Sequence, residues 1–137
     1  MRDELLVIED ASLHLSIVSK IASQAGFATT GASSVSEAAR LLREQQFDCI
    51  TLDLSLGEES GVEVLKLLAE MNCRTPIIVV SGSGDEVLKE TLKIGNFLDL
   101  NLYPQIPKPI NLAVLRNALT QIANDTERQK HATPGRW

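Results

Sequence analysis

Short apolar runs that end in polar residues alternate with longer amphipathic stretches along the whole chain. Residues 5–8, 48–53 and 76–80 are predominantly apolar, a pattern typical of strands buried on both faces of a sheet. Residues 27–30 form a weaker candidate strand of the same kind. A short fifth strand is expected before the Pro107-Lys108-Pro109 sequence, within a segment from Leu98 to Ile106 whose pattern also fits a loop or a helix extension.

Apolar residues at helical spacing separate these runs and predict five helices. Ser34 with Glu37, and Ser60 with Glu63, have the spacing of capping boxes, and Asn111 is a candidate cap for the last helix. The helices are expected at about residues 12–25, 35–46, 61–68, 85–94 and 112–124. Strands and helices therefore alternate five times, which predicts an α/β fold with a doubly wound parallel sheet and helices on both faces.

The length of 137 residues fits a single domain at residues 1–124, and the polar residues 125–137 are expected to form a frayed tail. The net charge of −5 and the absence of a long apolar run argue against direct nucleic-acid binding and against a membrane span. Cys49 and Cys73 lack metal-ligand spacing and are expected to be free thiols, which favours a cytoplasmic location.

Polar residues follow four of the five predicted strands at their carboxyl ends. Glu9 and Asp10 follow the first, Asp53 ends the third, Ser81 follows the fourth and Lys108 follows the fifth. In an open α/β sheet these ends meet at one edge, where binding sites form. Each residue taken alone can be an ordinary strand cap, but the ordered set of five predicts a site.

The residue types suit phosphoryl transfer. Three converging carboxylates repel one another unless a cation lies between them, and hard oxygen ligands suit Mg²⁺. Asp53 on a rigid strand end can attack phosphorus and form an aspartyl phosphate. Mg²⁺, Lys108 and Ser81 with the Gly82 backbone N–H are then expected to neutralise the three oxygens of the phosphoryl group.

From residue 4 to about residue 124 the chain resembles the receiver domain of two-component response regulators, of the single-domain, chemotaxis-regulator-like type. The resemblance rests on the acid pair before residue 11, on Asp53-Leu54-Ser55-Leu56 with Gly61, on Ser81 and on Lys108-Pro109. It implies a flavodoxin-like fold of five helices around a five-stranded sheet of order 2-1-3-4-5 and a cis Lys108–Pro109 bond.

The resemblance also assigns roles. Asp53 is expected to be the phosphoacceptor, served by a histidine kinase or a histidine phosphotransfer protein. Asp10, Asp53 and the Ser55 backbone carbonyl are expected to hold Mg²⁺, with Glu9 acting through a metal-bound water. The domain is expected to catalyse only its own phosphorylation and dephosphorylation, and to signal through an effector protein or a second copy of itself.

The sequence departs from the family before the lysine. Gln105 stands three positions before Lys108, where a typical receiver has an aromatic residue that turns inward with the switch hydroxyl. The readout of phosphorylation is therefore expected to differ from the usual one. His14, one helical turn after Asp10, is interpreted as a partly exposed helix residue without a phosphodonor role.

Three alternative functions agree less well with the sequence. A phosphatase of the haloacid-dehalogenase type needs a second Asp two positions after Asp53, where Ser55 stands. A nucleotide-binding module needs a Gly-rich loop after the first strand, where Glu9-Asp10-Ala11-Ser12 stands. A receiver-like interaction domain that works without phosphate would be expected to lack one of the five site residues, and none is missing.

Overall fold

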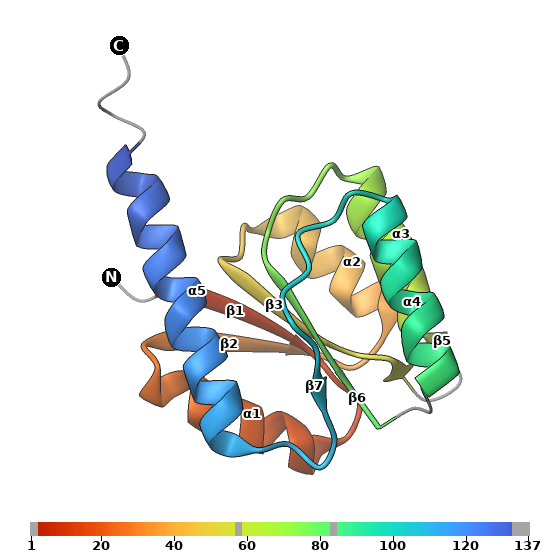
Figure 1. Ribbon diagram of the computed structural model, residues 1–137, viewed down its shortest axis with the longest axis horizontal. Coiled ribbons are helices and arrows are strands. Elements are labelled where there is room, and N and C mark those ends of the chain that lie inside the picture. Colours follow the sequence, from red (N-terminus) through yellow and green to blue (C-terminus); the bar gives the residue numbers. More distant parts are fainter. Residues whose placement is uncertain (1–2, 57–58, 83–84, 133–137) are drawn as a thin grey trace.

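A five-stranded parallel sheet runs through the middle of the molecule, with helices on both faces (Figure 1). The computed structural model describes residues 3–56, 59–82 and 85–132. The strands of the sheet are β1 (Asp3–Ile8), β2 (Phe27–Ala32), β3 (Cys49–Asp53), β6 (Ile77–Ser81) and β7 (Ile106–Pro107). Their spatial order is β2-β1-β3-β6-β7, so the sheet's own strands, counted along the chain, have the expected order 2-1-3-4-5.

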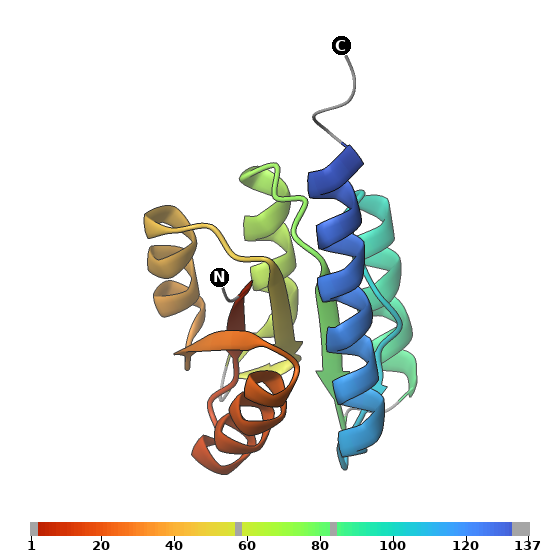
Figure 2. The same cartoon turned by 90° about the vertical axis from the view of Figure 1, so that its left-hand side faces the viewer.

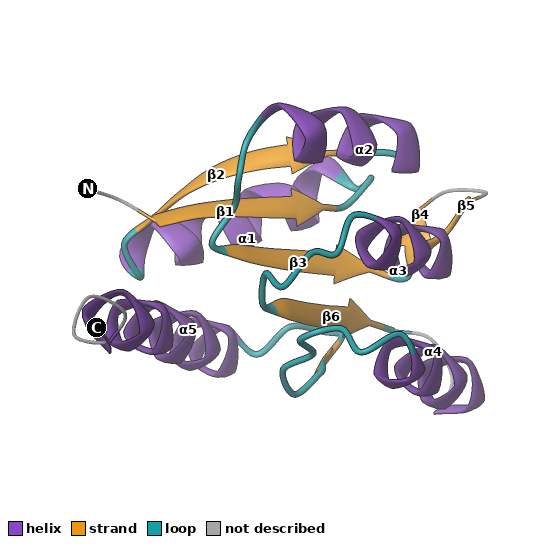
Figure 3. Cartoon of the chain, turned by 90° about the horizontal axis from the view of Figure 1, so that it is seen from above, coloured by secondary structure: helices purple, strands orange, loops and turns teal. Residues whose placement is uncertain are grey.

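Five helices surround the sheet, as the sequence predicts. They are α1 (Ser12–Gln24), α2 (Val35–Glu44), α3 (Gly61–Glu70), α4 (Asp85–Phe97) and α5 (Leu112–Ala132). Helices α1 and α5 cover one face and α2, α3 and α4 cover the other, an arrangement that is visible from the side and from above (Figures 2 and 3). No helix in the described ranges is long and apolar enough to cross a membrane.

Alternation along the central strands divides the core into two layers. Leu5 and Val7 pack with α1 and α5, while Leu6 and Ile8 pack on the side of α2, α3 and α4. All four are at most 1% exposed, because successive strand residues point to opposite faces and both faces are covered. This double burial explains why these strands appear in the sequence as continuous apolar runs.

Two of the predicted helix caps are confirmed. The Ser34 hydroxyl accepts a hydrogen bond from the Glu37 N–H at 3.1 Å, and Asn111 Oδ1 accepts from Ala113 N–H at 3.0 Å and Val114 N–H at 3.2 Å. Ser60 ends the short strand β5 (Glu59–Ser60), which pairs with β4 (Ser55–Leu56) directly before α3, and its role as a cap stays a prediction. The sequence did not predict this two-stranded pair.

The segment before β7, which the sequence left open, contains a helix extension and a loop. Helix α4 continues to Phe97, and Asp99 follows with a φ of 60°. Leu102 then forms a single bridge to Ile77 before the chain enters β7 at Ile106. The fifth strand is therefore short, and the bridge at Leu102 holds the preceding loop against β6.

The predicted end of the last helix at Asn124 is wrong, because α5 continues to Ala132. Its extension is anchored where Tyr103 OH donates a hydrogen bond of 2.8 Å to Asp125 Oδ2. An ion pair of 3.8 Å between Asp125 and Arg128 adds support on the helix surface. Residues 125–132 are thus helical, and the rest of the predicted tail lies outside the described residues.

We expect Gly61→Ala to destabilise the fold by roughly 1–3 kcal/mol, the usual cost of overpacking. A Cβ at Gly61 would lie 2.9 Å from Leu54 Cα and 3.1 Å from the Asp53 carbonyl oxygen, and this backbone has no room to move without disturbing Asp53. Urea unfolding measures the change. Gly95→Ala is the matched control, because its Cβ meets only the movable Leu102 side chain; equal costs for both variants would contradict the prediction.

We expect Asp125→Asn to lower the pKa of Tyr103. Burial, followed by the hydrogen bond and the negative charge of Asp125, raises that pKa to about 12. The resulting stability is present below the ordinary pKa of about 10 and is lost as the pH rises through about 12. Absorbance titration of the chain's single tyrosine measures the midpoint, which should fall in Asp125→Asn but stay above 10 because burial remains. Glu127→Gln, on the same helix, should leave it unchanged.

Candidate functional site

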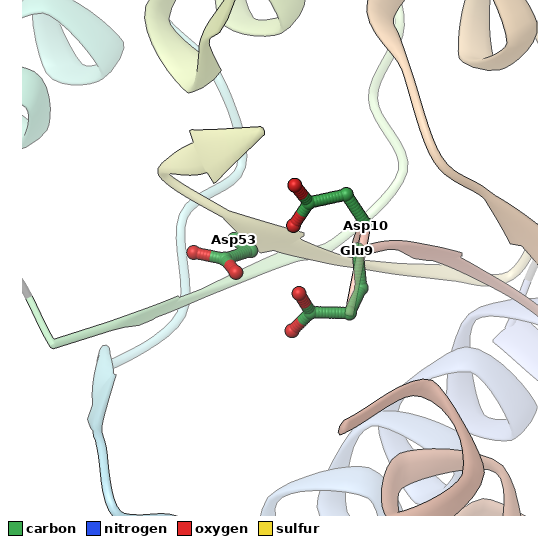
Figure 4. A group of neighbouring side chains, drawn as sticks. All are labelled: Glu9, Asp10 and Asp53. Atoms are coloured by element: carbon green, nitrogen blue, oxygen red, sulfur yellow. The ribbon is translucent and has the colours of Figure 1, made fainter. Parts of the chain in front are cut away.

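Three carboxylates meet at the carboxyl edge of the sheet, as the strand-end pattern predicts. One oxygen each from Glu9, Asp10 and Asp53 lies within 4.8 Å of the other two. Figure 4 shows the carboxyl groups of Glu9 and Asp10 pointing toward Asp53. The cause is the parallel pairing of β1 with β3, in which Ile8 stands beside Leu52, so that the next residue of each strand is an acid.

The cluster is buried on one side and open on the other. Glu9 and Asp53 are each 5% exposed, whereas Asp10 is exposed. The Ala11 N–H donates a hydrogen bond of 3.2 Å to Glu9 Oε2 and helps to hold that side chain in the turn after β1. A small ion or phosphate compound can therefore reach the carboxylates from the side of Asp10.

Lys108 places its ammonium against the two buried acids. Its Nζ lies 2.9 Å from Asp53 Oδ2 and 3.3 Å from Glu9 Oε1. The Lys108 N–H donates a 3.0 Å hydrogen bond to the Ser81 carbonyl, which fixes the lysine backbone at the end of β6. The Lys108–Pro109 peptide bond is cis, as the resemblance implies.

These charges shift the acid–base behaviour of the site. Burial raises the pKa of Glu9, and the hydrogen bond and charge of Asp53 raise it further. The hydrogen bond from the Ala11 N–H and the charge of Lys108 lower this pKa but do not outweigh the rise. Burial alone would lower the pKa of Lys108, but Asp53 and then Glu9 outweigh it and raise that pKa. The lysine therefore stays charged, and its charge offsets only part of the cost of burying the two acids side by side.

The other predicted site residues lie at the same edge. Ser81 is 3% exposed and pairs with Pro107 across β6 and β7, next to Lys108. Gly82 follows it at the surface, and a Cβ there would be 3.5 Å from Lys108 Cβ. Ser55 begins β4 two residues after Asp53. The ligand role of the Ser55 carbonyl stays a prediction.

Sequence reasoning missed the contact that His14 makes in this site. The prediction of partial exposure is confirmed, since the side chain is 38% exposed. However, His14 Nδ1 also lies 3.0 Å from Lys108 Nζ and 3.5 Å from Glu9 Oε1. The sequence indicated where His14 lies but not its partner, because a residue in the first turn of a helix that follows the acid pair stays near the sheet edge.

Gln105, the residue at the position of the usual aromatic, immediately precedes β7. Its Oε1 atom is buried and has no hydrogen-bond partner within the described part of the chain. The side chain lies beside an apolar pocket formed with Tyr103, Ile106, Val114 and Ala118. The polar Gln105 side chain thus lies among apolar side chains of β7 and α5.

Comparison with known proteins identifies the family. The sequence profile of the family described as "Response regulator receiver domain" matches residues 5–120. The chain belongs to the response regulator receiver domain family. It is a signalling domain of the two-component type, and the sequence interpretation is confirmed at this level.

Curated relatives carry this domain within longer regulators. The chain is 30% identical over 116 residues to the alginate biosynthesis transcriptional regulatory protein AlgB of Pseudomonas aeruginosa, covering 82% of this chain and 25% of AlgB. It is 33% identical over 86 residues to the transcriptional regulatory protein SrrA of Staphylococcus aureus, covering 63% of this chain and 35% of SrrA. The chain thus spans about a quarter to a third of these relatives.

Solved receiver structures share the fold. The receiver domain of the Francisella response regulator 1452 superposes with a TM-score of 0.77 at 24% identity, covering 91% of this chain and 99% of that one. A CheY-like receiver from Methanospirillum hungatei gives a TM-score of 0.81 at 18% identity, covering 94% and 99%. At these identities the likeness concerns the fold alone.

We expect Mg²⁺ to stabilise the protein, because a cation relieves the repulsion between the clustered carboxylates. At a Mg²⁺ concentration about ten times the Kd, the gain should be about 1.4 kcal/mol, measured by thermal unfolding with and without EDTA. Glu9→Gln should be more stable than wild type without metal, by on the order of 1 kcal/mol, and should gain less from Mg²⁺.

The pH dependence of the metal-free protein follows from the raised pKa of Glu9, which burial causes first and Asp53 second. Because the pKa of Glu9 is raised on folding, the fold loses stability as the pH rises through that raised value, and Glu9→Gln removes this loss. Glu70→Gln is the charge-matched control at the exposed far end of α3. A Mg²⁺ response that is identical in Glu9→Gln and Glu70→Gln would contradict the assignment of the cluster.

Proposed function

We propose that Asp53 accepts a phosphoryl group from a histidine kinase or a histidine phosphotransfer protein. The observation that carries the proposal is the contact of 2.9 Å between Asp53 Oδ2 and the Lys108 ammonium inside a cluster of three carboxylates. In the transfer, an Asp53 oxygen forms a bond to phosphorus while the bond from phosphorus to the donor nitrogen breaks, and the donor imidazole keeps the electron pair. The product is an aspartyl phosphate.

Lys108 would offset charge on the transferred group. A phosphoryl group spreads negative charge over three oxygens, and catalysis of its transfer consists mainly of placing positive charge and hydrogen-bond donors around them. Lys108 already lies next to the acceptor oxygen and stays charged, so it needs no large movement to reach a phosphoryl oxygen. The rigid strand end of β3 supports in-line attack by Asp53.

Mg²⁺ is the cofactor that fits the donor set. Glu9, Asp10, Asp53 and the Ser55 backbone carbonyl offer hard oxygens, with Glu9 acting through a metal-bound water, and the exposed Asp10 gives an ion access. When bound, the ion would supply charge neutralisation at the transferred group. Burial and then the neighbouring Asp53 raise the pKa of Glu9, and this supports a cation site, because a bound cation would stabilise the charged form of the buried carboxylate.

Ser81 and Gly82 would sense the phosphoryl group. Phosphorylation adds negative charge and acceptor oxygens at Asp53, and the Ser81 hydroxyl and the Gly82 N–H can donate to them. Ser81 lies at the end of β6, directly ahead of the segment that leads to α4. A population shift of that segment would then change the surface that a partner reads. Gln105 makes the usual aromatic coupling unavailable, so the readout would run through other contacts.

The output would pass through protein–protein contact, to an effector or to a second copy of the chain. The matched relatives are named transcriptional regulators, and a receiver of this kind would control such activity without touching nucleic acid itself. We place the domain in the cytoplasm, where kinases of such systems deliver phosphate. It would not act as an enzyme on other substrates, because Ser55 stands where a phosphatase would need its second Asp.

We expect acetyl phosphate with Mg²⁺ to add one phosphoryl group to the wild type, detected by intact-protein mass. Asp53→Asn should gain none, and EDTA should abolish the reaction in wild type. Asp99→Asn, an exposed acid far along the chain, is the control that should still react. If wild type gains no phosphoryl group and also fails to bind beryllofluoride, the domain is instead an interaction module that works without phosphate.

A further inference from the structure

We propose that His14 is a positioning residue that holds the Lys108 ammonium in the resting site and releases it to the phosphoryl group. The inference rests on the proposed function, since the group that takes over the contact is the phosphoryl group on Asp53. His14 comes from the first turn of α1 and Lys108 from the end of β7, 94 residues apart. Their contact of 3.0 Å ties these two elements together at the site.

The hydrogen-bonding capacity of the ammonium is filled. A lysine ammonium has three N–H donors. Lys108 Nζ has three acceptors within reach, namely Asp53 Oδ2 at 2.9 Å, His14 Nδ1 at 3.0 Å and Glu9 Oε1 at 3.3 Å. A phosphoryl oxygen can therefore gain a hydrogen bond from Lys108 only when one of these acceptors leaves.

His14 is the acceptor that leaves. The ammonium can only donate, so Nδ1 accepts and the ring proton is on Nε2. Glu9 keeps its charge when Asp53 is phosphorylated, and a bond from an ammonium to a carboxylate is stronger than one to an uncharged acceptor. Asp53 loses its charge in the aspartyl phosphate but carries the phosphoryl group, so Lys108 stays beside it. The His14 side chain is also 38% exposed, against 5% for the side chain of Glu9 and 6% for that of Asp53, so water can replace Lys108 at Nδ1 but not at the buried carboxyl groups.

The surroundings of His14 give the imidazole room to turn. An open, largely apolar pocket lies between α1 and the start of α5, and it is lined by His14, Ile17, Lys108, Pro109, Ile110 and Leu112. The imidazole can swing into this pocket when Lys108 turns to the phosphoryl group. His14 therefore keeps the lysine ordered before phosphorylation and competes with the phosphoryl group for it.

The test compares His14→Leu with His14→Asn, two side chains of nearly the same shape. Asn Oδ1 takes the place of Nδ1 as an acceptor, whereas Leu offers none. Binding of beryllofluoride at fixed Mg²⁺ is followed by amide NMR at about pH 8. His14→Leu should bind about threefold to tenfold more tightly than wild type, because one competing hydrogen bond is gone. His14→Asn should stay within about twofold of wild type.

A second readout needs neither metal nor phosphoryl mimic. The Lys108 ammonium signal in ¹⁵N NMR, assigned with Lys108→Arg, should be protected from exchange in wild type and in His14→Asn, and should lose protection in His14→Leu. Equal beryllofluoride affinities for the Leu and Asn variants, weaker binding by His14→Leu, or an unchanged ammonium signal would each overturn the inference.

The two proposals fail in different ways. If wild type binds no beryllofluoride, the phosphoacceptor function fails, and the competition for Lys108 fails with it. If wild type binds but the Leu and Asn variants do so equally, only the role of His14 fails. A merely structural role for His14 would change the unfolding temperature of both variants without separating them in affinity.

Discussion

The placement of one ammonium among three acids is the constraint on which the rest of the structure depends. Two buried carboxylates and a third at the surface lie within 4.8 Å of one another. Their negative charges repel one another strongly where the dielectric constant is low. Lys108, directly after the last strand, contacts the two buried carboxylates, so that strand must end at the same edge as β1 and β3. The strand order, the parallel register and the short β7 together bring Lys108 next to the acids.

Most of the fold was predictable because its strands are buried on both faces. Runs such as residues 77–80 have no polar position, and the amphipathic stretches between them fix the helices. The segment before β7 was not predictable in the same way, because its one bridge, at Leu102, depends on a tertiary contact with Ile77. The length of α5 was not predicted for a similar reason, because Asp125 accepts a hydrogen bond from a tyrosine 22 residues away.

The sequence predicted those parts of the candidate site that lie at strand ends. Five polar residues at the ends of apolar runs are brought to one edge, and the chain belongs to the family that this pattern resembles, while the role of each residue stays a prediction. The hydrogen bond from Lys108 to His14 could not be read in the same way, because the two residues are 94 positions apart and the imidazole sits on a helix with ordinary periodicity. Side-chain partners across such separations depend on packing, which no local pattern records.

The backbone hydrogen bond from the Lys108 amide to the Ser81 carbonyl has a mechanical consequence. It joins the residue that offsets charge to the residue that offers the hydroxyl, so neither backbone can shift without carrying the other. The ends of β6 and β7 are thus joined at the sheet edge by this hydrogen bond as well as by the pairing of Ser81 with Pro107. One backbone contact therefore links the hydroxyl-bearing strand end to the lysine that touches both buried acids.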